Sequence, residues 1–72
     1  MQWSFLFERD ETQEPKVIDV PNEVVPPLAG DKIEAHGKGG GEFRIKERKF
    51  VARFPDEDIG GTEAYGWSFL LE

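Results

Sequence analysis

The sequence predicts an all-β protein, a small five-stranded and mostly antiparallel barrel that occupies residues 1–72 as a single domain. Short segments rich in β-branched and aromatic residues alternate apolar with polar positions, the period of two typical of half-buried strands. No segment repeats apolar residues at helical spacing over about ten positions. The two ends of the chain nearly match: residues 3–8 read Trp-Ser-Phe-Leu-Phe-Glu and residues 67–72 read Trp-Ser-Phe-Leu-Leu-Glu. We therefore expect both ends to be strands of one sheet.

The first two strands are predicted at about residues 2–9 and 16–20. Aromatic residues occupy every second position of the first strand. The second strand is a β-branched run bounded by Pro15 and Pro21, and prolines sit at strand ends because they cannot donate to a ladder. The polar residues 10–14 between the two strands predict a hairpin loop.

The middle of the chain predicts a crossing loop and a second hairpin. Residues 24–29 are apolar but contain two adjacent prolines, which indicates an extended loop over one mouth of the barrel. The pair Gly30-Asp31 then turns the chain into a strand at residues 32–36. Residues 37–41 include four glycines and predict a flexible turn, after which the chain returns as a long strand over residues 42–54.

The long strand changes the parity of its apolar residues. Phe43 and Ile45 share one face, whereas Phe50 and Phe54 have the opposite parity. A uniform strand could not bury both sets, so we predict a β-bulge or sharp bend near residues 47–49.

The last strand is predicted to begin at residue 63 or 64 and to end at residue 72, after a polar turn at residues 55–62. We expect it to pair antiparallel with the first strand, with Phe5 opposite Phe69, so that the two ends close the barrel. The aromatic residues of both strands would then form the core. Leu6 and Leu70 would form a small apolar patch on the outer face, a candidate site for self-association.

Composition limits how so short a chain is stabilised. The 72 residues include no cysteine and a single histidine, which excludes disulfides and argues against a structural zinc site. We expect an aromatic core, helped by a homodimer, and no cofactor. Neither a basic segment followed by an apolar run nor a stretch of about 18 apolar residues is present. We therefore expect a complete small gene product that is soluble and cytoplasmic and has no membrane partner.

The net charge of −6 is unevenly distributed. Residues 32–53 contain seven basic and three acidic side chains, a local charge of +4, so the rest of the chain carries −10. The interpretation we favour is neutralisation by acidic side chains on neighbouring strands. The alternative is a surface that binds single-stranded nucleic acid, although the overall negative charge disfavours it. Its candidate contacts are Arg44, Lys46, Arg48 and Arg53.

The sequence predicts a protein that is not an enzyme. His36 is the only imidazole, and it shares a polar strand face with Glu34, whereas Asp31 projects from the opposite face. No nucleophile motif and no set of metal ligands accompanies it. The acidic residues 56–58 indicate a solvated hairpin tip because their spacing fails that of a calcium loop.

The run Pro-Leu-Ala-Gly-Asp-Lys-Ile at residues 27–33, the glycine turn, and a bent strand carrying Phe43 and Phe50 resemble the middle of compact SH3-like barrels. This resemblance covers residues 24–54 and implies a five-stranded SH3-like barrel with adjacent terminal strands. Stand-alone barrels of this size also resemble accessory proteins of phages and other mobile elements. The peptide-binding signatures of true SH3 domains are not recognisable, so the resemblance implies a fold and no ligand.

The function that the sequence predicts is that of a non-enzymatic binding or adaptor protein that acts through protein–protein contacts. Its partner would be another protein or a second copy of itself as a homodimer. The candidate partner-binding residues are Leu6, Leu70, Tyr65 and Trp67. A further alternative is a small-molecule binder at an aromatic rim formed by Tyr65, Trp67 and His36.

Overall fold

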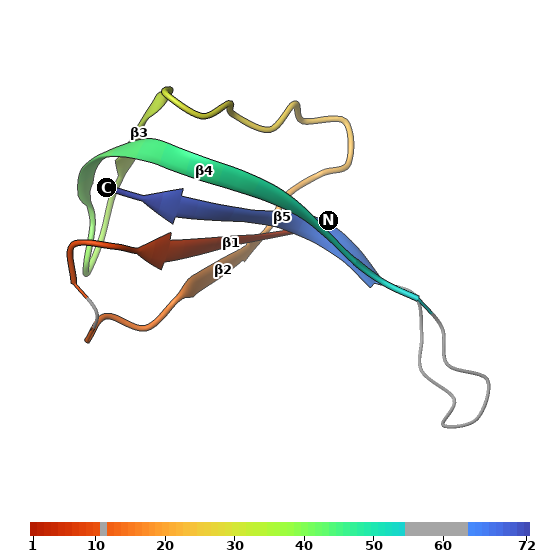
Figure 1. The fold of residues 1–72 in the computed structure, drawn as a ribbon, viewed down its shortest axis with the longest axis horizontal. Helices are drawn as coiled ribbons and strands as arrows, with labels where there is room; N and C mark the ends of the chain where they lie inside the picture. The colour runs from red at the N-terminus through yellow and green to blue at the C-terminus, as the bar shows by residue number, and fades with distance from the viewer. Residues whose placement is uncertain (11, 55–63) are drawn as a thin grey trace.

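The computed structural model describes residues 1–10, 12–54 and 64–72, and every regular element in these residues is a β-strand (Figure 1). The strands are β1 (Gln2–Phe7), β2 (Lys16–Asp19), β3 (Lys32–Ala35), β4 (Gly41–Arg53) and β5 (Ala64–Leu71). The all-β prediction is confirmed, and each strand lies within two residues of its expected bounds. The turn expected at residues 55–62, with its acidic residues 56–58, lies outside the described residues.

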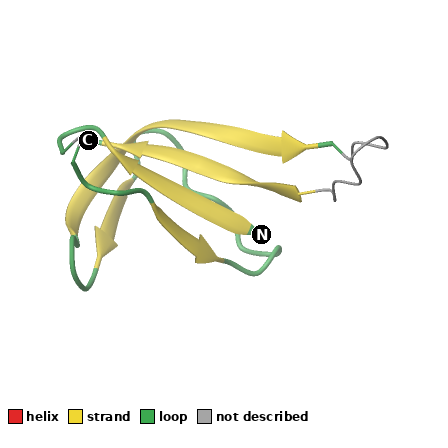
Figure 2. Ribbon diagram, turned by 90° about the horizontal axis from the view of Figure 1, so that it is seen from below, coloured by secondary structure: helices red, strands yellow, loops and turns green. Residues whose placement is uncertain are grey.

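The five strands form one mixed sheet in the order β2-β1-β5-β4-β3. The pairs β1–β2, β4–β5 and β3–β4 are antiparallel, whereas β1 and β5 are parallel. The sheet curls into a half-barrel with a concave and a convex face (Figure 2). We call these the inner and outer faces.

The expectation of a mostly antiparallel barrel closed by its two ends is therefore wrong. In the parallel register each residue of β1 lies beside its counterpart in the repeat, so Trp3 faces Trp67 and Phe5 faces Phe69. Side chains alternate with a period of two whichever way a strand runs, so the repeat predicts which faces match but not the direction of pairing. The paired ends lie in the middle of the sheet, and its edges are β2 and β3.

The predicted bulge in the long strand is confirmed. The register of β4 against β5 shifts between Ile45 and Glu47, which leaves Lys46 as the extra residue, just before the expected position. Ile45 pairs with Leu71 and Phe50 pairs with Trp67, so apolar residues on both sides of the bulge point to the inner face. The same shift turns Arg48 toward the inner face, where it pairs with Phe69.

The core lies on the inner face and is centred on Phe69. Its buried members are Trp3, Ile45, Phe69 and Leu71. The ring centroid of Phe69 lies 5.3 Å from that of Phe5, which stacks on it, and 5.4 Å from that of Trp3, which meets it edge-on. The Trp3 indole N–H is buried with no acceptor among the described residues. Ring packing, rather than a hydrogen bond, therefore orients this tryptophan.

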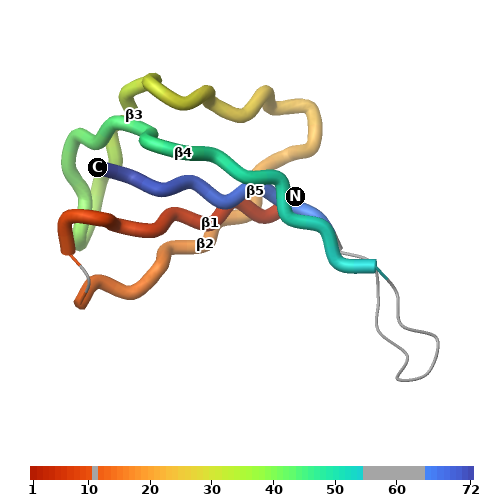
Figure 3. The backbone as a smooth tube through the Cα atoms, in the orientation of Figure 1, coloured from red at the N-terminus to blue at the C-terminus, as the bar shows by residue number. Residues whose placement is uncertain are grey.

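The segment between β2 and β3 runs from one edge of the sheet to the other, as the proline-rich sequence predicts (Figure 3). It is attached to β4 at its end, where Gly30 N–H donates to the Ile45 carbonyl at 2.7 Å and Ile45 N–H donates to the Asp31 carbonyl at 2.9 Å. Gly30 has φ of +95°, a left-handed conformation that favours glycine. We call residues 20–31 the crossing loop.

Candidate functional site

The half-barrel is open along the seam between its two edge strands, β2 and β3. A cavity of about 450 Å³ lies at this seam, and we call it the groove. Its floor is the inner face of the central strands, and Ile18 of β2 and Ile33 of β3 form its sides. The floor residues are Trp3, Phe5, Phe7 and Leu71. An apolar hollow of this size is typical of sites that bind a ligand or a partner side chain.

One end of the groove is bridged by a contact between two loops. Gln13, which precedes β2, donates through Nε2 to the Gly39 carbonyl in the turn between β3 and β4, at 3.3 Å. Gly39 has φ of +80°, and a β-carbon there would lie 2.5 Å from Gln13 Nε2. The backbone conformation therefore favours glycine here, whereas the end of the flexible Gln13 side chain could move aside from a β-carbon. The crossing loop bounds the groove elsewhere through Pro27.

The turn that carries Gln13 is organised by Asp10. Thr12 donates to Asp10 Oδ1 from its hydroxyl at 2.6 Å and from its backbone N–H at 3.1 Å. Gln13 N–H donates to the Asp10 carbonyl at 3.1 Å. The two hydrogen bonds from Thr12 to the carboxylate, with that of the hydroxyl the stronger influence, hold the pKa of Asp10 below its ordinary value of 3.8.

Replacing Thr12 with alanine is expected to raise the pKa of Asp10 toward 3.8, because the carboxylate loses its strongest donor. Thr12→Ser keeps the hydroxyl and should leave this pKa low. Because the native pKa is depressed, the turn stabilises the fold above pH 3.8 and loses this contribution as the pH falls through the native pKa. NMR titration of the Asp10 carboxyl measures the shift, and an unchanged pKa in Thr12→Ala would contradict the assignment.

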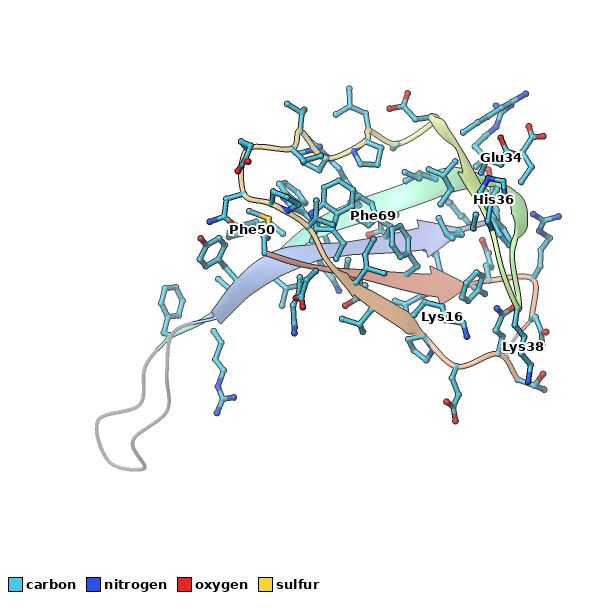
Figure 4. The ribbon with its side chains drawn as sticks, turned by 180° about the vertical axis from the view of Figure 1, so that it is seen from behind. Lys16, Glu34, His36, Lys38, Phe50 and Phe69 are labelled. Carbon is cyan, nitrogen blue, oxygen red and sulfur yellow. The ribbon has the colours of Figure 1, made fainter. Side chains whose placement is uncertain are left out.

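Charged side chains surround the bridged end of the groove (Figure 4). His36 Nε2 lies 3.6 Å from Glu34 Oε1, so these two residues face each other as expected for neighbours on one strand face. Lys16 and Lys38 also line the groove, and no carboxylate of the described residues lies within ion-pair distance of either. The rim at this end is therefore cationic although the chain is acidic.

The free edge of β2 carries unpaired backbone groups. Val20 N–H donates to the Met1 carbonyl at 2.8 Å, and the Met1 amino group donates back to the Val20 carbonyl at 3.0 Å. Hydrogen-bonded pairs alternate along antiparallel strands, so Ile18 also bonds to β1, whereas Val17 and Asp19 direct their N–H and C=O groups away from it. These two residues can receive another strand.

The predicted partner-binding residues fall into two separate places. Leu6 and Leu70 lie side by side on the outer face, because the parallel register pairs them directly. They border a shallow hollow of about 190 Å³ together with Glu47 and Lys49. Tyr65 and Trp67 point to the opposite, inner face. The four residues thus do not form one surface.

The predicted aromatic rim does not form as expected. Trp67 packs against Phe50, with ring centroids 5.2 Å apart, and the Tyr65 hydroxyl accepts a hydrogen bond from Asn22 at 3.1 Å. His36 lies at the other end of the inner face from Phe50 (Figure 4). The fourth strand is long enough to separate the imidazole from these rings, which the sequence pattern alone does not reveal.

The basic residues of β4 do not form the continuous row that alternation predicts. Arg48 lies on the inner face, with its guanidinium carbon 4.7 Å from the Trp67 ring centroid, whereas Lys46 donates to Glu8 Oε1 at 2.6 Å. The hydrogen bond to Glu8 raises the pKa of Lys46, which is the predicted neutralisation at one position. Arg44 and Arg53 lie near opposite ends of the strand. The bulge at Lys46 shifts the parity and disperses the set.

The groove and its lysines were not predicted from the sequence. Lys16 and Ile18 alternate in the sequence, which could have placed both on the inner face of β2. The approach of β2 to the turn after β3 depends on the curl of the whole sheet, which no local sequence pattern predicts.

Among residues 1–10, 12–54 and 64–72, no group of three or more histidine or acidic side chains is placed to hold a metal ion. The described part of the chain has no helix long and apolar enough to cross a membrane. Comparisons with protein-family models, with curated proteins and with solved structures found no match. The groove and the free edge of β2 are therefore the features on which a functional proposal rests.

Proposed function

We propose that this protein is a non-enzymatic binding module that takes an extended segment of a partner protein as an added strand along β2. The observation that carries the proposal is the free edge of β2 beside an apolar groove. A strand added there would hydrogen-bond to Val17 and Asp19. Its alternate side chains would enter the groove and cover the aromatic floor.

Of the two edges, β2 is the better acceptor. The side chains at the edge of β3 are charged and paired, Lys32 with Glu42 at 3.7 Å and Glu34 with His36. Charged side chains on an edge strand discourage further pairing. In β2 the charged residues Lys16 and Asp19 lie at the two ends, and between them Val17 and Ile18 expose about half of their surface, at 55% and 47%. Burying these side chains under a partner strand would stabilise the complex.

In this account the half-barrel is an SH3-like barrel opened on one side, from an accessory protein of a phage or another mobile element that acts in the cytoplasm. The bulged fourth strand and the glycine turn before it support the SH3-like part. Self-association through Leu6 and Leu70 remains compatible with it, because these side chains lie on the face opposite the groove. Single-stranded nucleic acid has less support, since the basic residues are dispersed.

Replacing Val17 with proline tests strand addition, because it removes an outward N–H and breaks no hydrogen bond to β1. Short random peptides selected for binding to the wild-type protein should bind Val17→Pro about tenfold more weakly, the effect of one lost hydrogen bond. Val17→Thr, which keeps the N–H and the β-branched shape, should bind them normally. Isothermal titration calorimetry measures the affinities, and urea denaturation reports whether each variant is folded.

A second measurement uses only the wild-type protein. Methylation of alternate backbone nitrogens in a selected peptide should abolish binding for one parity and spare the other, because an added strand hydrogen-bonds through every second residue. Equal effects of both parities, equal binding to Val17→Pro, or a selection that enriches no peptide would each contradict the proposal.

A further inference from the structure

We infer that the groove recognises the C-terminus of the partner chain, whose free carboxylate is held by Lys16 and Lys38. This inference rests on the proposed function and specifies its occupant. Three observations carry it: the bridge at one end of the groove, the two lysines beside that bridge, and the apolar floor that leads up to them.

The bridge indicates that a bound segment stops there. Gln13 and Gly39 join the loop before β2 to the turn after β3, so the two sides of the seam meet at this point. A chain that lay in the groove and continued past the bridge would have to leave the seam here. A segment that ends at the bridge needs no such exit.

The positive charges of the two lysines near the bridge fit a negatively charged chain terminus. The Lys16 side chain lies close to the bridge, since a β-carbon on Gly39 would lie 3.8 Å from Lys16 Cε. Lys38 is the neighbour of Gly39, and Figure 4 shows both lysines at this end of the inner face. A terminal carboxylate has two acceptor oxygens, and each lysine offers three donors and no acceptor. An amino terminus would instead meet two positive charges, since Glu34, which also lines the groove, lies beside His36 at 3.6 Å.

This placement also sets the direction of the bound segment. β2 runs away from the bridge, from Lys16 to Asp19. A segment whose C-terminus lies beside Lys16 runs toward the bridge and is therefore antiparallel to β2. Antiparallel pairing is the slightly more stable arrangement. Side chains at every second position before the terminus would point onto the floor at Phe5 and Trp3, so apolar residues are expected there.

The test compares peptides selected with a free C-terminus in their acid and C-terminal amide forms. On the wild-type protein the acid should bind about tenfold more tightly, since a hydrogen-bonded charge is lost in the amide. The difference should disappear in the double variant Lys16→Gln/Lys38→Gln. It should persist in Lys49→Gln, which removes one lysine charge from the outer face. Calorimetry at low and at physiological salt gives the affinities.

The outcomes separate this inference from the proposed function. Equal binding of acid and amide, with alternate N-methylation still effective, would overturn the terminal carboxylate and leave strand addition standing. If amide peptides also bind the double variant more weakly, the lysines contact acidic side chains of the peptide. This result would also overturn the terminal carboxylate. Peptides insensitive to N-methylation, or no selected peptide at all, would overturn the proposed function itself.

Discussion

Replacing Phe69 with alanine is expected to lower the free energy of unfolding by about 3–5 kcal/mol, the largest effect of any single change considered. Its side chain is 0% exposed and contacts the rings of both Trp3 and Phe5. A domain of 72 residues has a total stability of roughly 4–11 kcal/mol, so this loss would leave the variant near unfolding at room temperature.

Urea denaturation followed by tryptophan fluorescence measures this loss. Phe50→Ala is the matched control, because that ring is 52% exposed and its truncation should cost less than about 2 kcal/mol. Equal losses in the two variants would show that the core is not centred on Phe69.

Replacing Gly66 with alanine is expected to cost about 1–3 kcal/mol, as overpacking does in a tightly packed interior. A β-carbon at this position would overlap the carbonyl oxygen of Gln2, which is backbone and cannot move aside alone. The overlap exists because the parallel register places Gly66 opposite Gln2. The antiparallel pairing first expected would place Glu8 there instead.

This substitution therefore tests the topology as well as the packing. Chemical denaturation should show the loss, and amide hydrogen exchange should be faster in β1, which is forced away from β5. Ser68→Ala, on the same strand, adds no atom and should change stability by less than about 0.5 kcal/mol. Full stability of Gly66→Ala would contradict the parallel pairing.

Much of the fold could be predicted from the sequence, because each strand can be identified from the alternation of its own residues. Alternation identified all five strands, and the parity change between Ile45 and Phe50 located the bulge to within a few residues. The direction in which β1 and β5 pair could not be predicted in this way. Their common pattern is compatible with either direction, and the strand order decides between them only once the sheet is assembled.

The candidate site was less predictable because it depends on distant segments. Leu6 and Leu70 were correctly expected on the outer face, but their direct pairing follows from the parallel register. The groove needs β2, β3 and both flanking loops in place at once, and Gln13 and Gly39 meet across 26 positions of sequence. A rule that considers one strand at a time cannot find such a contact.

Binding of a partner segment along β2 and over the groove can be observed by NMR titration of the ¹⁵N-labelled protein with a selected peptide. We expect the largest amide shift changes at Val17 and Asp19, with intermolecular contacts between the peptide and the rings of Trp3 and Phe5. Shift changes confined to Leu6 and Leu70 on the outer face would contradict it.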